Sequence, residues 1–166
     1  MRASLLLALL LWAVPVAAQP LRIDGAVSAW SDAHRDRANV WSNVTLWTGV
    51  GLRVLEAWQA EDRADAFKTL GLQAAVSQGI TLAVKYSVHR ARPCAPLTCG
   101  SDAPYRSMLS GHMNTSTALM SRKYLAIALP LTMETGYLRI AANRHYLTDV
   151  LAGLAAGLVT QAIVRP

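Results

Sequence analysis

An arginine, a histidine and an aspartate lie close together near the carboxyl end of the chain. Arg139 is followed by His145 six residues later and by Asp149 four residues after that. An arginine can bind an anion, a histidine can attack it, and a carboxylate can orient the imidazole ring. If one helix carries both His145 and Asp149, the carboxylate can accept the imidazole N–H. The same spacing occurs on ordinary surface helices, so the hypothesis depends on partners elsewhere.

Two cations upstream could be such partners. Lys85 and Arg92 are seven residues apart, nearly two helical turns, so a helix would direct both side chains to one side. An arginine fork and a lysine charge together suit the oxygens of a phosphate group. Lysine and arginine are also common on ordinary surface helices near the C-terminus, because positive charge is favourable there.

Ser110, Gly111 and His112 fit the start of a helix. Free backbone N–H groups at that position, with the Ser110 hydroxyl, can bind an anion, and Gly111 allows close approach. His112 would then lie beside the anion, where it can give or take a proton. By itself the tripeptide is equally an ordinary helix start.

Helices must position these residues, because no stretch alternates convincingly as a strand. Besides a short helix around residues 27–34, the pattern predicts helices over residues 39–59, 61–90, 110–129, 131–143 and 149–164. Pro130 is expected to separate two of them and Thr148 to cap the last. The expected fold is all-α, a single bundle of about five to six helices.

Two features predict how the helices pack. Trp41, Trp47 and Trp58 recur with valines at helical spacing, which predicts an apolar stripe that faces the core. A belt at a membrane interface is the alternative. Gly153 and Gly157 predict close contact between the last helix and a neighbour.

Composition limits the partners. The chain has 166 residues, enough for one domain, is 53% hydrophobic and carries a net charge of +6. The basic residues are scattered, so a nucleic-acid partner is not expected. A phosphate-bearing substrate or an anionic membrane surface suits the charge better.

The first residues predict export. Residues 1–18 combine Arg2, an apolar centre and small residues, as in a signal peptide, with the mature domain over residues 19–166. An uncleaved anchor is the alternative. Cys94 and Cys99 can close a small disulfide ring in an oxidising compartment, and a zinc site is the other possibility. The expected location is the bacterial periplasm, with possible membrane association.

The three segments together resemble a known signature. Lys85-x6-Arg92-Pro93, Ser110-Gly111-His112 and Arg139-x5-His145-x3-Asp149 match, in order and spacing, the three motifs of the type 2 phosphatidic acid phosphatase (PAP2) family, which shares its core with vanadium haloperoxidases. The resemblance covers about residues 60–165. Leu109 and Leu138 depart from it, since the family usually has proline and serine there.

The resemblance implies a division of labour in a metal-independent phosphatase without a cofactor. His145 would attack phosphorus and form a phosphohistidine, Asp149 would orient it, and His112 would protonate the leaving group. Phosphate-binding residues would be Lys85, Arg92, Ser110, Gly111 and Arg139. The expected substrate is a phosphorylated lipid or a small phosphate ester.

Two other functions remain open at this point. The same site could hold vanadate and oxidise halides, although haloperoxidases are generally much larger. A non-catalytic anion-binding or membrane-associated protein is the other alternative, and it rests only on Leu109 and Leu138.

Overall fold

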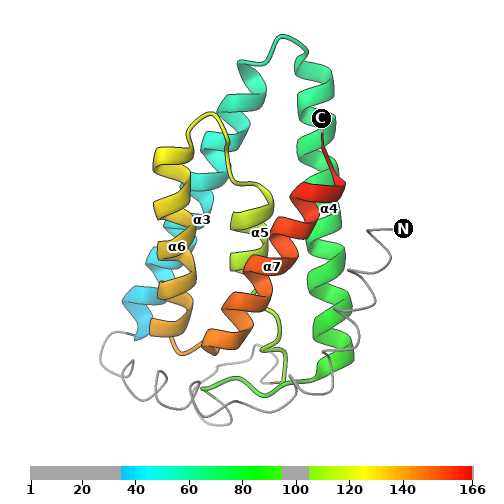
Figure 1. Cartoon of the computed structure of the whole chain (residues 1–166). Coiled ribbons are helices and arrows are strands. Elements are labelled where there is room, and N and C mark those ends of the chain that lie inside the picture. The colour runs from blue at the N-terminus through cyan, green and yellow to red at the C-terminus, as the bar shows by residue number, and fades with distance from the viewer. Residues whose placement is uncertain (1–34, 95–104, 166) are drawn as a thin grey trace.

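The structure, a computed structural model, describes residues 35–94 and 105–165 (Figure 1). Within these ranges it contains helices and no strands, which confirms the all-α prediction. The helices are α3 (Arg35–Trp58), α4 (Arg63–Val88), α5 (Gly111–Ala118), α6 (Leu125–Ala141) and α7 (Leu147–Ile163). The predicted signal peptide, the short helix around residues 27–34 and Cys99 lie outside the described residues.

Short helix α5 lies in the middle of the bundle (Figure 1). Helix α3 packs mainly against α6, and α5 packs mainly against α7. The two longest helices, α3 and α4, are joined by a tight turn in which Asp62 caps α4 by accepting a hydrogen bond from the Asp65 N–H at 3.0 Å. Four helix ends and the loop before α5 therefore meet at the opposite end of the bundle, drawn at the bottom of Figure 1.

The predicted third helix is wrong in length. Helix α5 ends at Ala118, and α6 already begins at Leu125, so Pro130 lies inside α6 instead of separating two helices. Long-range contacts stabilise the intervening turn. The Arg122 backbone N–H donates to Glu56 Oε2 at 3.2 Å, and the Tyr124 hydroxyl lies 2.7 Å from Gln59 Oε1. Local apolar periodicity does not encode these contacts.

Close packing between α5 and α7 depends on glycine. A Cβ at Gly153 would lie 2.6 Å from the Ser110 carbonyl oxygen, and one at Gly157 would lie 2.4 Å from Thr117 Cβ. Neither position has room for a side chain, which confirms the predicted close contact. The glycines thereby bring the N-terminus of α5 against the first turns of α7.

The interior of the bundle is unusually polar. Thr45 and Thr135 hydroxyls pair across α3 and α6 at 2.8 Å, and Asn114 Nδ2 donates to the Ser77 carbonyl at 2.7 Å and to Thr81 Oγ1 at 2.8 Å. Buried hydroxyl and amide side chains also occur at Ser42, Thr69, Gln73, Ser116, Thr117, Thr132, Thr160 and Gln161. Small and polar residues thus hold the helices together, as in helix bundles whose exterior is apolar.

The tryptophans lie on the exterior. Trp41, Trp47 and Trp58 are 57%, 66% and 59% exposed, so the predicted core stripe is wrong. The face of α3 that packs inward carries Ala38, Ser42, Thr45, Leu46 and Ala57 instead. An apolar stripe shows that a helix has two different faces, but it does not show which face the protein covers.

Large apolar side chains are exposed on other helices as well. They include Leu72, Leu82, Ile127, Tyr137, Leu151 and Leu158. Across residues 35–94 and 105–165, however, no helix combines the length and the apolar character needed to cross a membrane.

Candidate active site

The predicted site residues lie on helix ends and connections that meet at one end of the bundle, drawn at the bottom of Figure 1. Lys85 lies in the last turn of α4, Ser110 caps the start of α5, and Arg139 lies in the last turn of α6. His145 lies in the connection before α7, and Asp149 lies in the first turn of that helix. Five points of the sequence, more than sixty residues apart at the extremes, therefore contribute to one site.

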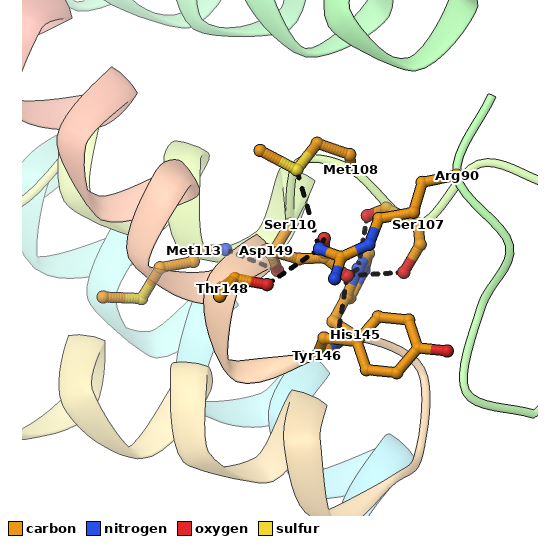
Figure 2. Close-up of polar contacts among 9 residues, drawn as sticks. All are labelled: Arg90, Ser107, Met108, Ser110, Met113, His145, Tyr146, Thr148 and Asp149. Atoms are coloured by element: carbon orange, nitrogen blue, oxygen red, sulfur yellow. Dashed lines mark hydrogen bonds and ion pairs between the residues drawn. The ribbon is translucent and has the colours of Figure 1, made fainter. Parts of the chain in front are cut away.

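Asp149 is the centre of a buried hydrogen-bond network (Figure 2). Its Oδ1 accepts from Arg90 Nη1 at 2.6 Å, and its Oδ2 accepts from the Ser107 hydroxyl at 2.5 Å and from the Tyr146 N–H at 2.9 Å. Burial acts to raise the pKa of Asp149, but its contacts with His145, Ser107 and Arg90 outweigh burial and lower that pKa below the ordinary 3.8. The carboxylate is therefore ionised at neutral pH.

His145 is held by a backbone carbonyl. Its Nδ1 lies 2.7 Å from the Ser107 carbonyl oxygen and 3.7 Å from Asp149 Oδ2, which is too long for a hydrogen bond. The prediction that the carboxylate accepts the imidazole N–H is wrong, because His145 precedes α7 and does not share its face. A carbonyl only accepts, so Nδ1 carries the proton and Nε2 carries the free lone pair.

Asp149 acts on His145 indirectly, by fixing the Ser107 loop and by its charge. Burial is the largest influence on the imidazole and lowers the pKa of His145 to about 4, although the nearby Asp149 carboxylate opposes this shift. At neutral pH the ring is therefore uncharged, and its Nε2 is available as a nucleophile.

Arg90 follows the C-terminus of α4 and lies inside the site. It is 2% exposed, donates to Thr148 Oγ1 at 2.8 Å as well as to Asp149, and its guanidinium lies over the Tyr146 ring at 4.5 Å. Thr148 is therefore a partner of Arg90 and not the predicted helix cap, a position that Tyr146 takes. No local spacing links Arg90 to residues some sixty positions later, and sequence reasoning missed it.

The cations form one electrostatic cluster. Burial, followed by the charges of Arg92 and Arg139, lowers the pKa of Lys85 to about 8. Burial, followed by Arg92 and Arg144, lowers the pKa of Arg139 to about 9. Such mutual repulsion is relieved by a bound anion. Among the residues that the structure describes, no group of three or more His, Cys, Asp or Glu side chains could hold a metal ion.

The start of α5 contributes less to an anion cradle than the sequence suggested. The Ser110 N–H donates to the Asp149 carbonyl at 3.0 Å, and its fully buried hydroxyl accepts from the Met113 N–H at 3.4 Å. The predicted use of the Ser110 N–H is therefore wrong, because that group is already paired. Gly111 stays at the site: a Cβ built on it would lie 4.0 Å from Lys85 Nζ.

His112 and Arg139 both receive contacts from α3. His112 Nε2 lies 2.7 Å from Asn43 Oδ1, and Arg139 Nη1 donates to Asn39 Oδ1 at 2.8 Å and to the Ser42 hydroxyl at 3.2 Å. Sequence reasoning missed these three residues. Their signal was a polar face at positions 39, 42 and 43, one helical turn long, within an otherwise apolar helix.

The positive neighbours also affect the second histidine. Burial is the largest cause that lowers the pKa of His112 to about 3, followed by the charges of Arg139, His145, Lys85 and Arg92. His112 is thus uncharged at neutral pH while the site is empty. A bound anion would act in the opposite direction and favour the protonated ring.

The two positions that depart from the PAP2 motifs lie in packed surroundings. Leu109 is 2% exposed, and Leu138 packs against Ala38, Ala141 and Ala142 at the junction of α3 and α6. Both leucines therefore contribute to packing next to the site. Cys94 is buried, but its predicted partner Cys99 is outside the described residues, so the pairing stays a prediction.

Comparisons with known proteins point in one direction. A family model described as the PAP2 superfamily matches residues 66–165. LpxE from Aquifex aeolicus is similar in structure, with a TM-score of 0.67, 18% identity, and coverage of 89% of this chain and 97% of that chain. The first transmembrane PAP2 type phosphatidylglycerolphosphate phosphatase from Bacillus subtilis is also similar in structure, with a TM-score of 0.69 and 19% identity. The match covers 98% of this chain and 93% of that chain. None of the curated proteins matches the chain.

Proposed function

The chain belongs to the PAP2 superfamily, and from that premise we propose that it is an exported phosphatase that hydrolyses a phosphate monoester through a phosphohistidine on His145. One observation carries this proposal: a buried, uncharged imidazole with Nε2 free lies within the electrostatic influence of several cations. A nucleophile and an anion-binding cluster in one site are what phosphoryl transfer requires.

The cations would bind the phosphate group. Lys85, Arg92 and Arg139 would neutralise its non-bridging oxygens, and Gly111 would let the group come close to the start of α5. For phosphoryl transfer, positioning and charge stabilisation supply most of the catalysis. Three fixed cations can provide the positive charge, so the proposed reaction needs no metal ion.

His145 Nε2 would attack phosphorus opposite the leaving oxygen, so that a P–N bond forms as the P–O bond breaks. His112 would pass a proton to the departing alkoxide, and the bound dianion would help to charge His112 beforehand. Water would then attack the phosphohistidine with His112 as the base, which releases phosphate and restores both histidines. Asp149 would stabilise the positive charge on His145 during the first step.

The substrate would be an amphiphile with a phosphate group on an apolar body. A surface groove lined by Val40, Asn43, Val44, Trp47 and Thr48 adjoins the site, since Asn43 also contacts His112. The apolar part of the leaving group could lie there. One of the similar structures is named a phosphatidylglycerolphosphate phosphatase, and its name refers to a substrate of this class.

The exterior supports membrane association. Exposed tryptophans and aliphatic side chains surround a polar interior, and the net charge of +6 favours an anionic surface. We place the protein in the bacterial periplasm, attached to a membrane, with residues 1–18 as its export signal.

A panel of phosphate esters tests the proposal. We expect the mature chain to release phosphate from a long-chain lipid phosphate with a higher kcat/KM than from p-nitrophenyl phosphate, and to do so in excess chelator. Trp47→Ala should lower kcat/KM for the lipid about tenfold, because a groove side chain of this size contributes roughly 1.5–3 kcal/mol on burial, and should leave the soluble ester unaffected.

Trp41→Ala is the matched control, since Trp41 and Trp47 lie on the same helix with 57% and 66% exposure but only Trp47 lines the groove. Equal losses in the two variants would contradict the groove assignment. Absence of phosphate release from every ester would contradict the phosphatase itself, and loss in chelator would contradict metal independence.

The pH dependence of kcat/KM should reveal Lys85. Its pKa of about 8 means that the ammonium is charged below pH 8 and lost above it, so phosphate capture should fall on the alkaline side of that value. Lys85→Arg should move this alkaline limb up by at least about one pH unit, because an arginine stays charged. Lys68→Arg, an exposed position on α4, is the control. An unchanged limb in Lys85→Arg would show that another group titrates there.

A further inference from the structure

Helix α3 begins far upstream of the matched region 66–165, yet it contacts the second histidine of the site. Asn43 Oδ1 lies 2.7 Å from His112 Nε2, a hydrogen bond between residues 69 positions apart. The identity of the donor in this hydrogen bond decides which nitrogen of His112 faces the reaction.

The orientation of the Asn43 amide settles the donor. Asn43 Nδ2 donates to the Asn39 carbonyl oxygen at 3.2 Å, one turn earlier on α3. The amide nitrogen of Asn43 therefore faces the backbone of α3, and its amide oxygen faces His112. An amide oxygen only accepts, so His112 Nε2 must carry a proton. The unprotonated nitrogen of the neutral ring is then Nδ1.

We propose that Asn43 is a positioning residue that reserves Nδ1 of His112 for proton exchange with the leaving group. This inference rests on the proposed phosphatase function. Held by Asn43, the Nε2 proton stays on the ring throughout. A second proton on Nδ1 moves to the alkoxide oxygen as the P–O bond breaks, and Nδ1 then accepts a proton from the attacking water.

The side-chain carbonyl of Asn43 also stabilises the charged ring of His112. In imidazolium both nitrogens donate, and the Oδ1 acceptor strengthens its bond to Nε2 when the ring becomes positive. This contact opposes the repulsion that His112 receives from Lys85, Arg92 and Arg139. Removal of Asn43 should therefore impair proton donation, while the binding of phosphate by the cations should persist.

Leaving groups of different basicity separate these two effects. An alkyl phosphate needs a proton on its departing oxygen, whereas p-nitrophenyl phosphate leaves well without one. General acid catalysis contributes on the order of 10² to 10⁴-fold, so Asn43→Ala should lower kcat/KM for a short alkyl phosphate about tenfold or more. The same variant should change kcat/KM for p-nitrophenyl phosphate less than about threefold, well under the lower end of that range.

Asn43→Asp and Ser87→Ala complete the experiment. Asn43→Asp keeps an acceptor for Nε2–H and should restore the alkyl phosphate rate to within a few-fold of the parent. Ser87→Ala removes an exposed hydroxyl of α4 that donates to the Ala83 carbonyl at 2.8 Å, and should behave as the parent with these small esters.

Three results would overturn the inference: equal losses for both esters in Asn43→Ala, no loss for either, or an Asn43→Asp variant that behaves like Asn43→Ala. The first would indicate a structural role of Asn43. A parent protein that is inactive on both esters would instead contradict the phosphatase function.

Discussion

His145→Ala is expected to reduce phosphate release by about 10⁴-fold or more, the scale on which loss of a nucleophile acts in covalent catalysis. The reason is that the surroundings of His145 prepare an uncharged ring with an unprotonated nitrogen: the Ser107 carbonyl accepts from Nδ1–H at 2.7 Å, which leaves Nε2 free. Steady-state assays with a lipid phosphate and with p-nitrophenyl phosphate measure the loss. Rapid acid-free quenching with radiolabelled substrate should show phosphate bound to the parent and absent from the variant.

Two controls make this result specific. His89→Asn alters the other described histidine outside the site, an exposed residue at φ 48 where asparagine is well tolerated, and should retain full activity. Circular dichroism should show the helix content of the parent in both variants. A fully active His145→Ala, or labelled phosphate on another residue, would require a different nucleophile.

Arg90→Met is expected to destabilise the protein by about 3–5 kcal/mol, the usual cost of removing one partner from a buried ion pair. Arg90 Nη1 and Asp149 Oδ1 are 2.6 Å apart, and their side chains are 1% and 0% exposed. Without Arg90, the carboxylate keeps the Ser107 hydroxyl and the Tyr146 N–H but loses its countercharge. Urea or thermal unfolding of parent and variant in the same buffer measures the difference.

The loss should depend on pH in a known direction. Folding lowers the pKa of Asp149 below 3.8, so its ionised contacts contribute fully above that value and are lost as the pH falls through the folded-state pKa. The difference between parent and Arg90→Met should therefore be largest near neutral pH and shrink in strong acid. Activity should fall as well, because Asp149 fixes the loop that holds His145.

Arg53→Met is the matched comparison. Arg53 and Glu56 form a looser, partly exposed pair at 3.7 Å, and pairs of this kind contribute at most about 1 kcal/mol. Comparable losses in Arg53→Met and Arg90→Met would show that the loss of any paired arginine, and not of the buried pair in particular, accounts for the destabilisation.

Local patterns predicted the long helices well. The expected helices over residues 39–59 and 61–90 correspond to α3 and α4, because apolar spacing is a property of short stretches of chain. The third helix failed for the opposite reason. Its interruption after Ala118 depends on a contact of Arg122 with Glu56 in α3 and of Tyr124 with Gln59 just after α3, some sixty-five residues earlier in the chain.

The sequence by itself determined which residue types are available for the reaction, since the spacing of Lys85, Arg92, His112, His145 and Asp149 within their motifs is a property of the chain. Tertiary structure decided their hydrogen-bond partners: Ser107 for His145, Arg90 for Asp149, and Asn43 for His112. It also decided that the tryptophan face of α3 points outward. The physical reason is the same in each case: a motif encodes distances along the chain, whereas these partners are brought together by the packing of segments that lie 38 to 69 residues apart in sequence.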